Sequence, residues 1–175
     1  MGLSCGAGAV LFALGCIFVA RIFLALRRHE AGKPGRQGTV SVLVVLGSGG
    51  HTTEILRLMD SLSASYAPRH YVIANTDRMS EEKVRILEAA RTKGNTEPQV
   101  LCNGPGTCVP LCISALIVRI LGMKKTLIIY IESICRVETL SLSGKILYHL
   151  SDYFFVQWST LQEKYPKAIY LGRLV

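Results

Sequence analysis

The chain has 175 residues, half of them hydrophobic, and a formal net charge of +8. This length accommodates one domain of ordinary size, and the mean hydropathy of +0.35 exceeds that of most soluble domains. The positive charge favours anionic ligands such as phospholipid headgroups or pyrophosphates. Nucleic acid is the least favoured partner, because no basic run is interleaved with aromatic residues. The six cysteines form no Cys-x-x-Cys pair, so the sequence predicts neither a disulfide framework nor a metal site.

An apolar segment opens the chain. Residues 2–20 contain no charged side chain, and residues 22–26 extend the run beyond Arg21. The whole run is long enough to cross a bilayer. Basic residues follow it, whereas a cleavable signal peptide carries its positive charge before the apolar run. The sequence therefore predicts a single-pass transmembrane anchor with its basic flank in residues 1–30, and a cytosolic C-terminal domain.

The composition changes after the anchor. Residues 31–39 are rich in glycine and read as a linker, so the folded domain is predicted to span residues 40–175. Within it, short β-branched runs alternate with amphipathic stretches. The predicted strands are 40–46, 71–74, 100–102, 126–131, 153–156 and 168–171, and the predicted helices are 53–64, 80–93, 110–121 and 144–150. This alternation predicts an α/β fold with a doubly wound parallel sheet.

A glycine-rich loop follows the first predicted strand and precedes a helix. It consists of Gly47, Ser48, Gly49, Gly50 and His51, with Thr52 next. Ligands of open parallel sheets bind at the carboxyl ends of the strands, where helix N-termini present free N–H groups. Glycines allow close approach of a phosphate, and the imidazole is a candidate general base. A tight turn without a ligand also fits. Two nucleotide-binding fingerprints fit less well. The dinucleotide fingerprint requires a third glycine where Thr52 stands, and the Walker loop requires Gly-Lys-Ser/Thr where His51 and Thr52 stand.

Two further loops are predicted at the same edge of the sheet. The first contains Asn103, Gly104, Gly106 and Thr107, and the second contains Glu132 and Arg136. Two glycine loops at one edge favour a shared anionic ligand. Each loop also has a plain structural explanation, because the glycines can serve a turn and the glutamate and arginine can form a solvated pair.

Four segments together resemble a known family. Residues 46–56, 101–107, 130–140 and 170–173 closely resemble the membrane-anchor subunits of the eukaryotic UDP-N-acetylglucosamine transferase. That heterodimer extends dolichol-diphosphate-linked N-acetylglucosamine at the endoplasmic reticulum membrane. The resemblance implies the N-terminal, acceptor-side half of a split GT-B glycosyltransferase, active only with a soluble catalytic subunit that holds most of the UDP-N-acetylglucosamine site.

The position of the loops and the resemblance together lead us to expect a role for each of them. His51 is the candidate base toward the acceptor hydroxyl, the glycine loops lie on the diphosphate, and Glu132 with Arg136 orients the lipid-linked acceptor. UDP-N-acetylglucosamine is the donor substrate, and no cofactor or metal is expected.

The middle of the chain departs from the family pattern. Family members have a further strand and helix before the strand that ends at Asn103, whereas this sequence has only the short stretch 94–99. A form shortened in this way leaves a second function open, namely a non-catalytic membrane scaffold that only recruits a soluble partner. A nucleotide-dependent oxidoreductase is a weaker alternative, because Asn75 stands where an acidic residue is expected after the second strand.

Overall fold

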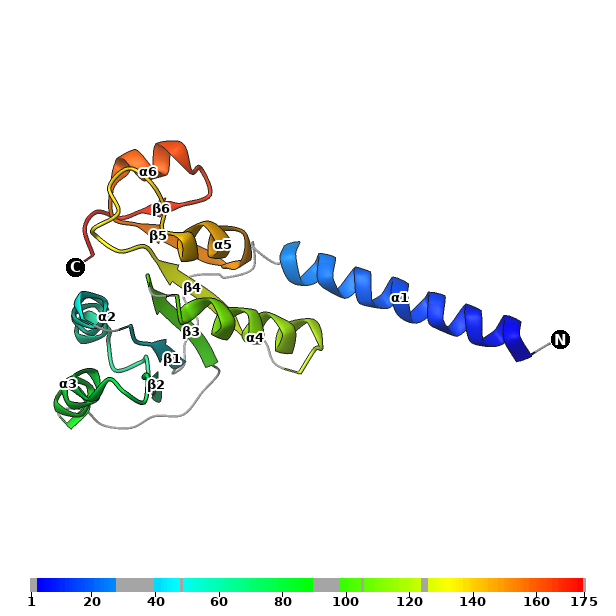
Figure 1. Ribbon diagram of the computed structural model, residues 1–175, viewed down its shortest axis with the longest axis horizontal. Coiled ribbons are helices and arrows are strands. Elements are labelled where there is room, and N and C mark those ends of the chain that lie inside the picture. The colour runs from blue at the N-terminus through cyan, green and yellow to red at the C-terminus, as the bar shows by residue number, and fades with distance from the viewer. Residues whose placement is uncertain are drawn as a thin grey trace.

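The computed structural model describes residues 3–27, 40–47, 49–89, 98–104, 106–123 and 126–174 (Figure 1). Within these ranges, a long N-terminal helix precedes an α/β domain built on one sheet. The predicted linker, residues 31–39, and Ser48 of the first glycine loop lie outside the described residues.

Six parallel strands form the sheet of the described chain, in the order β2-β1-β3-β4-β5-β6. The strands are β1 (Ser41–Val45), β2 (Arg69–Val72), β3 (Pro98–Asn103), β4 (Leu127–Ile131), β5 (Tyr153–Val156) and β6 (Ile169–Tyr170). The helices are α1 (Leu3–Arg27), α2 (Gly50–Ser61), α3 (Arg78–Ala89), α4 (Cys108–Ile120), α5 (Leu142–Leu150) and α6 (Ser159–Lys164). The predicted doubly wound parallel sheet is therefore confirmed, and only α6 is a helix that the sequence pattern did not predict.

Successive residues of the central strands point to opposite faces of the sheet, and each face has its own core. Val42 and Val44 of β1 pack with Ile55 and Met59 of α2 and with α3. Val45 of β1 lies in the core on the other face of the sheet, which α4 and α5 cover. Cys102, Cys108 and Cys112 are fully buried in this second core.

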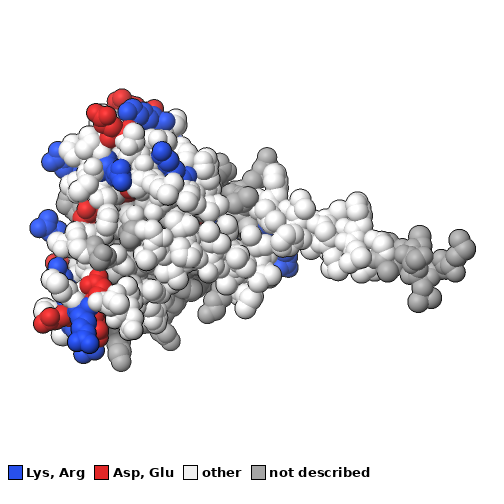
Figure 2. Space-filling view, in the orientation of Figure 1, with Lys and Arg blue, Asp and Glu red and all other residues white. Residues whose placement is uncertain are grey.

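The helix α1 extends away from the domain (Figure 1). It is attached at its C-terminal half, where Nη1 of Arg21 donates to the carbonyl oxygen of Leu121 at 2.9 Å. In the view of Figure 2, charged side chains gather on the part of the domain that is remote from α1, and the described part of α1 shows almost none. Among the described residues, no helix combines the length and hydropathy that crossing a membrane requires, so the predicted span is not confirmed.

Candidate functional site

Three loops meet where β1, β3 and β4 end. These strands are adjacent and parallel, so their carboxyl ends lie at one edge of the sheet. The chain leaves β1 toward one face and β3 toward the other, which makes this the switch point where open α/β sheets bind ligands. A pocket of about 320 Å³ lies at this point. Its lining residues are Gly50, His51, Glu54, Gly104, Glu132, Ser133, Cys135, Arg136 and Ser141.

The first glycine loop is held by its own threonine. Gly49 adopts φ 68°, in the left-handed region that favours glycine, and Gly50 begins α2. The buried Thr52 hydroxyl donates to the carbonyl oxygen of Gly47, and its oxygen lies 2.7 Å from Oγ of Ser80. No side-chain cap is formed at the N-terminus of α2 in the described structure, and Gly50 and His51 of its first turn line the pocket. The role of Thr52 toward a ligand stays a prediction.

His51 packs directly over the second glycine loop. A Cβ atom added to Gly104 would lie 2.7 Å from Cε1 and 2.8 Å from Nδ1 of the imidazole, and Gly104 has φ 65°. Nδ1 of His51 is buried and has no hydrogen-bond partner among the described residues. The two glycine loops that the sequence predicted at one edge are thus in contact, and the imidazole forms part of the pocket wall between them.

Glu132 lines the pocket, and it is completely buried from solvent. Its carboxylate accepts hydrogen bonds from the amide nitrogen of Ser133 at 3.1 Å and from the amide and hydroxyl of Ser141 at 3.0 Å each. Burial raises the pKa of Glu132, and these donors and the nearby positive charge of Arg136 offset only part of that increase. A carboxyl group with a raised pKa in a pocket can hold or transfer a proton, or can orient a hydroxyl group.

The other predicted residues differ in their access to the pocket. Arg136 is exposed and lines it, whereas Asn103 is 1% exposed and lies behind its wall. Gly106 and Thr107 are exposed at the start of α4 and do not line the pocket. Their contact with a ligand stays a prediction.

Glu54 lines the pocket but is not among the predicted site residues. It accepts hydrogen bonds from Nδ2 of Asn103, from Oγ of Ser133 and from the amide of Ile134. The one signal in the sequence is its position three residues after His51, which places both side chains on one face of a helix.

Comparisons with known proteins identify the family. The family model described as "Oligosaccharide biosynthesis protein Alg14 like" matches residues 42–100 and 92–174. The chain belongs to this family. A rat protein named UDP-N-acetylglucosamine transferase subunit ALG14 is 48% identical over 206 residues, covering 93% of this chain and 94% of the relative. The human protein of the same name is 48% identical over 217 residues, which covers 99% of this chain and 97% of the human protein. That of Yarrowia lipolytica is 40% identical over 174 residues, with 77% and 81% covered. No solved structure matches the chain significantly.

The same comparisons locate a gap in the chain relative to the family. The alignments with the rat and human proteins extend over 206 and 217 positions, although the chain has only 175 residues. The relatives therefore contain residues with no counterpart here. The family match divides into two segments that meet at residues 92–100. This junction agrees with the shortened middle portion that the resemblance predicted, between α3 and β3.

Proposed function

We propose that this chain is the acceptor-side subunit of a heterodimeric N-acetylglucosaminyltransferase that uses UDP-N-acetylglucosamine and a dolichol-diphosphate-linked sugar. Its relatives are named as transferase subunits, and the six-stranded parallel domain fits one half of a GT-B enzyme. A soluble partner subunit would supply the other half and most of the donor site. Activity therefore depends on the complex of the two chains.

The observation that carries the proposal is the contact between His51 and Gly104 in the wall of the switch-point pocket. An acceptor hydroxyl must lose its proton as it attacks the sugar carbon, and an imidazole in the pocket wall is a candidate to accept that proton. The uncapped N-terminus of α2 and Arg136 provide a suitable environment for the acceptor diphosphate. The buried carboxyl group of Glu132 is fixed by three hydrogen bonds and orients the acceptor sugar.

The proposal includes attachment of the domain to the endoplasmic reticulum membrane through α1, with the α/β domain in the cytosol. Large apolar side chains of α1, such as Phe12, Phe18 and Phe23, are more than half exposed. Exposed apolar side chains of this size on a projecting helix suit a lipid environment. Protease digestion of a C-terminal tag in intact microsomes tests the orientation. A protected tag contradicts it.

The test of catalysis is His51→Ala in the chain co-expressed with its soluble partner. We expect transfer to a lipid-linked acceptor to fall about 10²-fold or more, the scale that loss of a general base produces. Recruitment of the partner to membranes should be unchanged. His70→Ala, on the exposed edge strand β2, is the matched control and should transfer at the wild-type rate. Equal rates for both variants contradict the assignment of His51 as the base.

A non-catalytic membrane scaffold is the second candidate, because the family match breaks at residues 92–100. In that case the chain recruits the soluble partner without forming a competent acceptor site. The same assay separates the two functions, since a scaffold recruits the partner but its wild-type complex transfers no sugar.

A further inference from the structure

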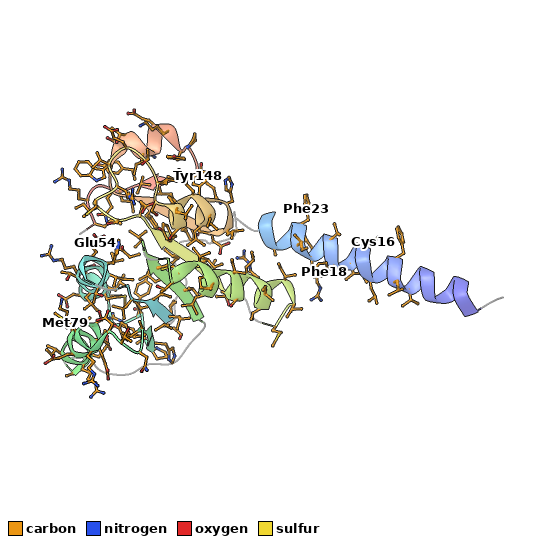
Figure 3. All side chains as sticks on the ribbon, viewed as in Figure 1. Cys16, Phe18, Phe23, Glu54, Met79 and Tyr148 are labelled. Carbon is orange, nitrogen blue, oxygen red and sulfur yellow. The ribbon has the colours of Figure 1, made fainter. Side chains whose placement is uncertain are left out.

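The carboxylate of Glu54 joins two walls of the pocket. Glu54 lies on α2, one turn after His51 (Figure 3). Its Oε2 accepts from Nδ2 of Asn103, at the end of β3, over 3.2 Å. Its Oε1 accepts from Oγ of Ser133 at 2.9 Å, and Oε2 also lies 3.4 Å from the amide nitrogen of Ile134. One side chain therefore holds segments that are 49 to 80 residues away in the sequence.

The segments that Glu54 holds lead directly into the pocket wall. Asn103 immediately precedes Gly104, against which His51 packs. Ser133 and Ile134 immediately precede Cys135 and Arg136, which form another part of the pocket wall. Glu54 therefore connects the part of the pocket wall that holds the candidate base with the part that holds the arginine.

We propose that Glu54 is a positioning residue, which holds these two walls at the separation that the lipid-linked sugar diphosphate requires. This inference rests on the proposed function. Both carboxylate oxygens of Glu54 accept hydrogen bonds from groups of the protein itself, which is the arrangement expected of a positioning residue. Its contribution is to acceptor binding, and the donor sugar nucleotide does not depend on it.

A glutamine can perform the same positioning role. Its carbonyl oxygen can accept from Asn103 and Ile134, and its amide can donate to the hydroxyl oxygen of Ser133, because a hydroxyl group both donates and accepts. Alanine at this position removes all three contacts. The pair Glu54→Ala and Glu54→Gln therefore separates positioning from chemistry that needs a carboxylate.

Steady-state kinetics of the co-expressed complex provide the first test. Glu54→Ala should raise the acceptor KM about fivefold or more, while the donor KM changes less than about twofold. Glu54→Gln should recover most of the acceptor affinity, to within about threefold of wild type. Glu81→Ala, which removes an exposed carboxylate paired with Arg85 on α3, is the control. The proposal is overturned if Glu54→Gln is as impaired as Glu54→Ala, or if donor and acceptor KM rise together.

A second variant covers the case in which Glu54→Ala does not fold. Ser133→Ala removes only one of the three donors, and it should raise the acceptor KM about two- to threefold without changing the donor KM. An unchanged acceptor KM in Ser133→Ala contradicts the proposal.

Hydrogen exchange provides a readout that does not depend on turnover. Glu54→Ala should accelerate amide exchange about fivefold or more in peptides that cover both Asn103 and Ile134, whereas Glu54→Gln and Glu81→Ala should not. A wild-type complex that transfers no sugar contradicts the proposed function. The hydrogen-exchange comparison of the Glu54 variants can still be made in that case, and it tests the role of Glu54 separately. If Glu54→Ala changes the exchange rate in only one of the two peptides, or in neither, Glu54 does not hold the two segments together and the proposal is refuted.

Discussion

At the scale of single residues, the contact between His51 and Gly104 depends on the absence of a side chain at position 104. Gly104 adopts φ 65°, and an added Cβ would lie 2.7 Å from Cε1 of His51. Gly104→Ala would therefore strain the backbone and displace the imidazole. Because a general base must remain within hydrogen-bond reach of the proton that it accepts, kcat/KM of the complex should fall about tenfold or more.

Gly106→Ala is the matched comparison for this variant. Gly106 lies in the same loop, but an added Cβ meets nothing within 4 Å. Gly106→Ala should therefore lower kcat/KM by a factor that is at least about fivefold smaller than the factor for Gly104→Ala. Equal decreases would show that the loop backbone, rather than the position of His51, determines the rate.

At the scale of elements, α5 begins in contact with the buried carboxylate. Oγ of Ser141 accepts from the amide of Gly144 at 2.9 Å and thus caps the helix, while the Ser141 hydroxyl donates to Glu132. The backbone of Gly144 passes so close that an added Cβ would overlap Oε2 of Glu132. The first turn of α5 and the carboxylate of Glu132 are therefore packed as one unit.

Gly144→Ala tests this packing. It should destabilise the protein by about 1–3 kcal/mol, because the new methyl group must displace a carboxylate that is fixed by three hydrogen bonds. Gly50→Ala, at the start of α2, is the control, since an added Cβ there meets nothing within 4 Å. Thermal unfolding of the purified complex measures both variants. A Gly144→Ala protein as stable as Gly50→Ala would contradict the close contact with Glu132.

The strands and long helices could be predicted because their patterns are local. The central strands β1 and β4 consist mainly of β-branched and other apolar residues, and their predicted positions agree with the structure. The strand β2 begins at Arg69, earlier than predicted, because that side chain is buried and donates to the carbonyl oxygens of Met59, Leu62 and Tyr66. The six-residue helix α6 is too short to produce a periodic signal.

The site was predictable in its glycine loops and His51, since strand ends and glycines can be read along the sequence. Glu54 was not, because its partners lie 49 to 80 residues away. The sequence also does not show which glycines are tightly packed against other side chains. Gly104 and Gly144 approach other side chains closely, whereas Gly106 does not, and only the folded chain distinguishes them.

At the scale of the whole molecule, β2 forms one edge of the sheet in the part of the chain that the structure describes. Among the described residues this strand pairs only with β1, and each of its four residues keeps some exposed area, although the Arg69 side chain itself is buried. In the doubly wound order 3-2-1-4-5-6, the strand that follows β2 through a helix pairs with its other edge. The residues that the relatives have and this chain lacks belong at that step, between α3 and β3. The missing segment is therefore expected to cover β2.

Inserting the corresponding human segment between Ala89 and Pro98 should restore that strand and its helix. New pairing along β2 and burial of its outer side chains should raise the unfolding midpoint of the complex by about 2–4 °C or more, the shift that roughly 1 kcal/mol produces in a domain of this size. Sugar transfer should increase with it if the shortened middle impairs the acceptor site. A Gly/Ser insertion of equal length is the control, because it adds chain without a strand. If the Gly/Ser protein is as stable and as active as the restored one, the free edge of β2 is not where the family's additional unit lies.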